Sequence, residues 1–151
     1  MAEHSARIAE NRKARHYYEF LELFEAGISL TGAEVKSLRA GRVSFGDSYV
    51  DFSTGEALLT GLHISPYERG GYVRQEPERI RQLLLHRREI DKLKAQTEQK
   101  GLTVVPIKFY LKNGKIKLEI ALARGKKLYD RSEDLKNRAE SRDMERELAG
   151  R

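Results

Sequence analysis

Apolar and polar residues alternate most clearly in the segment Leu102–Ala123, which predicts a β-hairpin. Its centre, Asn113-Gly114, is the dipeptide that favours a two-residue type I′ turn. This turn predicts the cross-strand pairs Leu111 with Ile116, Phe109 with Leu118, Ile107 with Ile120 and Val105 with Leu122 on the core face, and Lys108 with Glu119 on the other. Pro106 has no N–H for the strand ladder, so we expect an edge position or a bulge there.

The segment Leu30–Gly41 has the pattern of a short, capped helix. Thr31 and Glu34 have the spacing of a capping box, in which each side chain bonds to the backbone N–H of the other residue. Val35 and Leu38 share the buried face, and the final glycine suits the position that ends a helix. The solvent face should carry Glu34, Lys36 and Arg39. Glu34 is therefore either a cap alone or also a binding residue.

A longer helix is predicted at Pro77–Glu98, because proline is tolerated in the first helical turn. Gly101 follows it and suits a helix end. The buried stripe would consist of Ile80, Leu83, Leu84, Ile90 and Leu93. The opposite face would be solvated and carries Arg79, Arg81, Arg87, Arg88, Lys92 and Lys94.

Further strands are predicted before this helix. His16–Phe24 is rich in aromatic residues, which is typical of a strand, and this strand is interrupted at Gly27 and resumes at Ile28–Leu30. Asp47–Phe52 and Glu56–Ile64 should pair as a hairpin around a Ser-Thr-Gly turn.

Two polar segments are rich in cations. Asn11–His16 reads N-R-K-A-R-H, and Ser65–Glu76 combines two arginines with two tyrosines. Such a mixture suits RNA, because guanidinium groups bind phosphates and tyrosine rings stack on unpaired bases. A solvated chain terminus and an ordinary surface connection are the plainer interpretations.

The order of these elements predicts a mainly β protein. Strand, short helix, two strands, long helix and two strands is the order of an OB-type Greek-key barrel with an extra helix after its first strand. OB barrels usually bind oligonucleotides or oligosaccharides. A barrel of another topology with an attached helix is the alternative.

Composition narrows the class of partner. The 151 residues suffice for one domain with its own core, and 29 Lys+Arg against 23 Asp+Glu favour a polyanionic partner, either nucleic acid or an anionic membrane. The sequence has neither an apolar run long enough to cross a bilayer nor the apolar stretch of a signal peptide, so we expect a cytoplasmic protein. The lack of cysteine excludes disulfides and cysteine-ligated zinc.

The sequence offers little support for catalysis. Its four histidines have no metal-binding spacing, and it contains no Ser nucleophile elbow, Walker loop or dinucleotide fingerprint. We therefore predict a protein that is not an enzyme, has no catalytic or metal-binding residues and needs no cofactor.

Several segments, in order along the chain, together resemble the bacterial SsrA-binding protein family (small protein B, SmpB). They are N-R-K-A-R-H at 11–16, A-G-I-S-L-T-G-A-E-V-K-S-L-R-A-G at 26–41, D-S-Y-V at 47–50, H-I-S-P-Y-E at 63–68, L-L-L-H at 83–86, V-P-I-K-F-Y-L-K-N-G-K at 105–115 and G-K-K-L-Y-D-R at 125–131. The resemblance implies an OB-fold protein that binds the tRNA-like domain of transfer-messenger RNA (tmRNA). It also implies delivery of this RNA to stalled ribosomes for trans-translation.

In this family, RNA binds to one face of the barrel. The resemblance implies RNA-binding roles for Asn11, Arg12, Lys13, Glu34, Lys36 and Arg39, with Tyr67, Arg69 and Arg74 in the nearby loop. Cations would bind phosphates, and the Glu34 carboxylate, which only accepts hydrogen bonds, could bond to a base N–H or a 2′-OH.

Residues 124–151 are highly charged and contain few apolar side chains, so we predict a tail that is separate from the domain at 1–123 and does not pack in isolation. The resemblance implies that this tail becomes helical in the decoding centre and empty messenger path of the ribosome. The residues implied are Gly125, Lys126, Lys127, Tyr129, Arg131, Lys136 and Arg138. A tail that stays solvated is the alternative.

Two other functions stay open. A generic single-strand-binding or ribosomal OB protein would bind RNA without preferring a tRNA-like shape. A protein-interaction adaptor would bind its partner independently of Lys36 and Arg39. For the protein that the resemblance implies, we expect a monomer that does not bind membranes.

Overall fold

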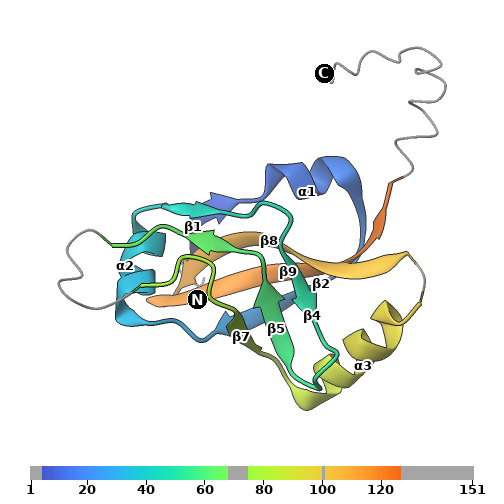
Figure 1. Ribbon diagram of the computed structural model, residues 1–151. Helices are drawn as coiled ribbons and strands as arrows, with labels where there is room; N and C mark the ends of the chain where they lie inside the picture. Colours follow the sequence, from blue (N-terminus) through green and yellow to red (C-terminus); the bar gives the residue numbers. More distant parts are fainter. Residues whose placement is uncertain (1–4, 68–74, 100, 127–151) are drawn as a thin grey trace, which may run out of the picture.

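The computed structural model describes residues 5–67, 75–99 and 101–126. Its helices are α1 (Arg12–Tyr17), α2 (Gly32–Arg39) and α3 (Arg87–Thr97). Its strands are β1 (Ser5–Glu10), β2 (Tyr18–Ile28), β3 (Val43–Ser44), β4 (Tyr49–Asp51), β5 (Ala57–Thr60), β6 (His63–Ile64), β7 (Arg81–Leu84), β8 (Leu102–Lys112) and β9 (Lys115–Gly125). The helices lie around the outside of the strands (Figure 1).

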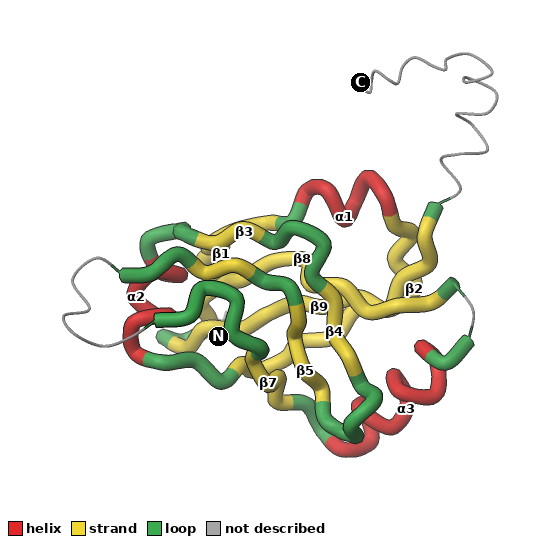
Figure 2. Tube along the Cα trace, viewed as in Figure 1, coloured by secondary structure: helices red, strands yellow, loops and turns green. Residues whose placement is uncertain are grey.

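One large antiparallel sheet dominates the described part of the chain. Its strand order is β1-β8-β9-β2-β7-β5-β4, and β3 pairs with β6 in a separate two-stranded sheet. The edge strand β4 also lies against β8, so the sheet curls back on itself (Figure 2). The predicted fold class, a mainly β barrel of OB type, is confirmed.

The hairpin of β8 and β9 forms as predicted next to its turn. Asn113 and Gly114 have φ values of 52° and 81°, the left-handed conformation that a type I′ turn requires. The predicted pairs Leu111 with Ile116, Phe109 with Leu118 and Lys108 with Glu119 are confirmed.

Further from the turn, a bulge between Pro106 and Lys108 shifts the register of this hairpin by one residue. The bulge expected at Pro106 is therefore confirmed, but the predicted pairs Ile107 with Ile120 and Val105 with Leu122 are wrong. Because side chains alternate between the faces of a strand, the shift sends Val105 and Ile107 to the outer face. There they pack with Ala14, under α1, in a second apolar cluster.

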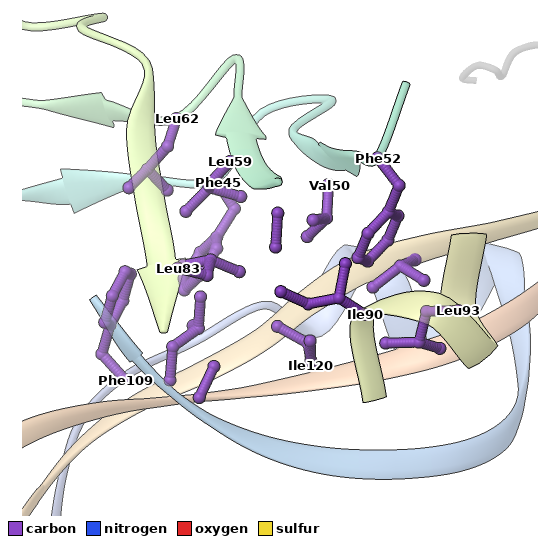
Figure 3. Close-up of a cluster of buried hydrophobic side chains, with 14 of the residues drawn as sticks. Phe45, Val50, Phe52, Leu59, Leu62, Leu83, Ile90, Leu93, Phe109 and Ile120 are labelled. Atoms are coloured by element: carbon purple, nitrogen blue, oxygen red, sulfur yellow. The ribbon is translucent and has the colours of Figure 1, made fainter. Parts of the chain in front are cut away.

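The main core lies between the curled sheet and α3 (Figure 3). Its large side chains point toward one another from strands that are far apart in sequence, and Phe45 stacks on Phe109 with ring centroids 5.7 Å apart. Burial of each large aliphatic side chain stabilises the fold by about 1.5–3 kcal/mol. The labelled members are Phe45, Val50, Phe52, Leu59, Leu62, Leu83, Ile90, Leu93, Phe109 and Ile120.

The long helix predicted at Pro77–Glu98 is wrong in its first half. This half contains strand β7, and only α3 is helical. Burial alternates along β7, so Leu83 is in the core, whereas Leu84 is 57% exposed and Ile80, just before the strand, is 54% exposed. Three apolar residues at spacings of three and one fit either a helix or a strand, and so short a pattern does not separate them.

The N-terminal segment is more ordered than a solvated terminus. Strand β1 pairs with β8, helix α1 follows it, and β2 runs through Gly27 without the predicted interruption. The predicted hairpin around the Ser-Thr-Gly turn is confirmed by β4 and β5, although its second strand ends at Thr60.

Candidate RNA-binding surface

The capping box at the start of α2 is present as predicted. The backbone N–H of Glu34 donates to Oγ1 of Thr31 at 3.2 Å, and the Thr31 N–H donates to Oε1 of Glu34 at 2.9 Å. Glu34 is only 8% exposed, so the expectation that its carboxylate points into solvent is wrong. The side chain reaches back along the helix to its cap and into the protein.

Two arginines of one segment, Arg79 and Arg81, bind the Glu34 carboxylate. Arg79 donates through Nη2 to Oε1 at 2.6 Å and through Nε to Oε2 at 3.1 Å. Arg81 donates through Nε and Nη2 to Oε2 at 3.0 and 2.8 Å. We call Glu34, Arg79 and Arg81 the buried ion cluster. It ties α2 to the segment that leads into β7.

Arg81 is completely buried, and Arg79 is partly buried, so their predicted place on a solvated helix face is wrong. Arg81 lies on the inward face of β7, where it also donates to the carbonyl oxygens of Leu62 at 2.8 Å and Pro77 at 2.9 Å. A buried guanidinium needs such acceptors, because an unpaired buried charge is very costly.

The ion cluster holds Glu34 ionised. Burial alone raises the pKa of a carboxyl group, but the hydrogen bonds from Arg79, the Thr31 backbone and Arg81 outweigh burial and lower the pKa of Glu34 to about 2. Conversely, the hydrogen bond to Glu34 raises the pKa of Arg79. Both carboxylate oxygens already accept hydrogen bonds within the protein.

Lys36 and Arg39 are exposed on α2, as predicted. Nζ of Lys36 lies 5.7 Å from the ring centroid of Tyr67, a cation–π contact. The side chain of Gln75 accepts from the Tyr67 N–H at 2.6 Å and donates to the Tyr67 carbonyl at 3.0 Å. It therefore joins the two ends of the segment 68–74, which lies outside the described residues and includes the predicted binding residues Arg69 and Arg74.

The second predicted basic group lies on α1. Asn11 is buried and caps this helix: its Oδ1 accepts from the Ala14 N–H at 3.2 Å and its Nδ2 donates to the Pro106 carbonyl at 2.8 Å. Arg12 and Lys13 are exposed. Lys13 donates to Asp47 at 3.0 Å, and this hydrogen bond raises the pKa of the lysine.

The two basic groups occupy separate parts of the molecule. Helix α1 rests on β2 and β8, whereas α2 contacts β6. The two helices lie at different places around the strands (Figure 1). The predicted residues thus form two groups rather than one cluster: the exposed Lys36 and Arg39 with the half-buried Tyr67, and the exposed Arg12 and Lys13. Each is supported from below by a buried polar side chain, Glu34 and Asn11 respectively.

Comparison with known proteins places the chain in a family. The model of the family described as SmpB protein matches residues 8–150. This chain belongs to the SmpB family. SsrA-binding proteins of the same family include that of Nitratidesulfovibrio vulgaris (strain DP4), 63% identical over 94% of this chain and 92% of the relative. That of Lawsonia intracellularis (strain PHE/MN1-00) is 61% identical over 95% of this chain and 93% of the relative.

A solved structure described as "tmRNA-SmpB: a journey to the center of the bacterial ribosome" is also similar. It is 54% identical in sequence, with a TM-score of 0.69, over 81% of this chain and 86% of that chain. An SmpB protein in that structure therefore shares the fold described above.

Two residues predicted for the tail of this SmpB family member are described. Gly125 pairs with Tyr18 at the end of β9, and Lys126 donates through its backbone N–H to the Tyr17 carbonyl at 2.9 Å and through Nζ to the Arg15 carbonyl at 3.1 Å. The chain thus leaves the barrel beside α1. Lys127, Tyr129, Arg131, Lys136 and Arg138 lie outside the described residues.

Sequence reasoning missed the buried role of Arg79 and Arg81, which hold the Glu34 carboxylate. The alternation of side chains along a strand could have revealed this role, because it places Arg81 and Leu83 on the same face of β7. An arginine on the same face as a core leucine predicts a buried acidic partner such as Glu34. Within the described residues no group of three His, Asp or Glu side chains could hold a metal ion. None of the helices there has the length and apolar character to cross a membrane.

Proposed function

We propose that this protein binds the tRNA-like domain of tmRNA and delivers it to stalled ribosomes for trans-translation, as a cytoplasmic RNA-binding protein rather than an enzyme. The observation that carries the proposal is the match to the SmpB family over residues 8–150. Relatives that cover nearly the whole chain are named SsrA-binding proteins, and the similar solved structure is of tmRNA-SmpB in the bacterial ribosome.

The proposed RNA-binding residues are the exposed cations Arg12, Lys13, Lys36 and Arg39, together with Tyr67 and the loop residues Arg69 and Arg74. Exposed cations bind phosphates, and a half-buried tyrosine beside Lys36 offers an aromatic face next to a positive charge. Asn11 and Glu34 have a supporting role in this proposal. Their polar atoms bond within the protein and hold α1 and α2 in place.

We further propose that the C-terminal segment acts on the ribosome through Gly125, Lys126, Lys127, Tyr129, Arg131, Lys136 and Arg138. The first two residues of the tail predicted at 124–151 belong to β9, so a separate tail would begin after the barrel strand. Lys126, the last described residue, lies on the surface beside α1, so the chain that follows starts from an exposed point. Circular dichroism of a 124–151 peptide should show helix formation when ribosomes are added. An unchanged spectrum would contradict a helical tail.

The deciding experiment compares the tRNA-like domain of tmRNA with an unstructured RNA of equal length at near-physiological salt. Wild-type protein should prefer the tRNA-like domain, and the double variant Lys36→Met/Arg39→Met should bind it more weakly while keeping its circular dichroism spectrum. The matched control Arg87→Met/Arg88→Met removes two exposed cations from α3 and should bind like wild type. If the wild-type protein bound the two RNAs with equal affinity, this result would contradict the proposed function. The protein would then be only a basic OB protein that binds RNA without preference.

A further inference from the structure

A groove beside α1 has features of a ligand site, and its lining shares Asn11, Lys13 and Gly125 with the residues of the proposed function. Its volume is about 410 Å³, near the lower end of the range of about 300–1,000 Å³ that is typical of ligand pockets. Its lining includes Lys13, Ala14, Tyr17, Asp47, Ser48 and Gly125. One wall is thus α1, another is the loop that precedes β4, and the third is the end of β9.

The wall formed by the loop contains an unsatisfied polar group. Ser48 is 5% exposed, and its Oγ has no hydrogen-bond partner among the described residues. Buried hydroxyl groups normally have a partner, because an unpaired one costs free energy. A change of the Ser48 rotamer can turn the hydroxyl toward the groove, where it would donate to or accept from a ligand.

The surroundings of the groove favour an anionic ligand with an aromatic part. Lys13 lines the groove and is paired with Asp47, and Arg15 is paired with Glu10. Arg12, the first residue of α1, and Lys126, whose Nζ donates to the Arg15 carbonyl in the last turn of α1, lie outside the lining and form no ion pair within the described residues. The lining combines an exposed tyrosine, Tyr17, with the apolar Ala14 and Val105. A nucleotide has both an anionic and an aromatic part. Its phosphate can lie beside the cations, and its base can lie against the tyrosine ring.

We propose that this groove binds one unpaired nucleotide of RNA. The base lies against the ring of Tyr17, the Ser48 hydroxyl bonds to the edge of the base, and the phosphates lie toward Arg12 and Lys126. The inference rests on the proposed function in that the ligand is RNA. It adds a subsite for a single base, which separates this part of the surface from the phosphate-binding cations of α2.

Gly125→Leu tests the groove directly. Nothing lies within 4 Å of a Cβ added at Gly125, and its backbone is not left-handed, so a larger side chain is accommodated without strain at a residue that lines the groove. The full-length variant should lose roughly tenfold or more in affinity, both for the tRNA-like domain and for a short unstructured oligoribonucleotide, because it excludes a stacked base. Gln99→Leu adds the same side chain at an exposed position just after α3 and should change neither affinity.

Two further measurements distinguish a failure of the groove proposal from a failure of the proposed function. Ser48→Ala should weaken binding of the oligoribonucleotide severalfold without lowering the melting temperature, and ultraviolet cross-linking of that RNA should label Tyr17. Unchanged affinities in Gly125→Leu, or cross-links only outside the groove, would overturn the proposal. A wild-type protein without preference for the tRNA-like domain would instead contradict the proposed function, while the oligoribonucleotide would still test the groove.

Discussion

A carboxylate can serve RNA binding without touching RNA. Glu34 satisfies the cap of α2 and two arginines with the same two oxygens. Since α2 also carries Lys36 and Arg39, the ion cluster fixes the position of both exposed cations relative to the barrel. We therefore propose that Glu34 positions the candidate binding surface, and that Lys36 and Arg39 on α2 would contact the phosphates.

The ion cluster makes stability depend on pH in the acidic range. The pKa of Glu34 is about 2 in the folded protein and has an ordinary value of 4.5, so its stabilising effect is complete above pH 4.5 and is lost as pH falls toward 2. At about 1.4 kcal/mol per pH unit, this effect is on the order of 3 kcal/mol at pH 7. Urea unfolding should show that Glu34→Gln is destabilised by about this amount at pH 7, with roughly half the difference left at pH 3.

A matched control exists in α3. Glu89 occupies the same capping-box position in that helix, and its Oε1 accepts from the His86 N–H at 3.0 Å, but it forms no ion pair with any described residue. Glutamine can also cap, so Glu89→Gln should change the free energy of unfolding by well under 1 kcal/mol at either pH. Equal effects of the two substitutions would show that the arginines add nothing to the cap.

At the scale of the element, sequence reasoning succeeded where the signal is local. The capping box of α2 and the type I′ turn at Asn113-Gly114 involve residues within four positions of each other, and both are confirmed. It failed for β7, where the strand is decided by pairing with β5 and β2, and so by residues far away in sequence. The polar strand β1 was missed for the same reason, because its partner is β8.

The type I′ turn gives a prediction for a single methyl group. Gly114→Ala places a Cβ at φ 81°, where L-residues are strained, and should destabilise the protein by about 1 kcal/mol in urea unfolding. Gly32→Ala is the control, because the φ of Gly32 is not left-handed. The two variants are otherwise comparable, since no atom lies within 4 Å of a Cβ added at either glycine. Alanine is the better helix former, so Gly32→Ala should be neutral or slightly stabilising. A stabilised Gly114→Ala variant would contradict the assigned turn.

At the scale of the whole molecule, fold class and family were predictable because many segments agree in order and spacing along the chain. The arrangement of the binding residues was not. A sequence does not reveal that α1 and α2 rest on different strands, nor that the bulge at Pro106 turns Val105 and Ile107 outward to support α1. Both features follow from pairing between β8, β9 and the N-terminal segment, which are distant in sequence.

The two exposed groups should differ in how they respond to salt. Each phosphate that a cation neutralises releases counterions, so the slope of log K against log salt concentration becomes shallower by about 0.7–0.9 for every phosphate that is left without its cation. Lys36→Met/Arg39→Met should therefore make the slope for the tRNA-like domain shallower by about 1.5. Gly125→Leu removes no charge from the protein, so its slope should become shallower only through the phosphates that the excluded nucleotide no longer brings to Arg12 and Lys126. Equal slopes for wild type and the α2 variant would mean that Lys36 and Arg39 do not bind phosphates, and would move the electrostatic part of the interface to α1.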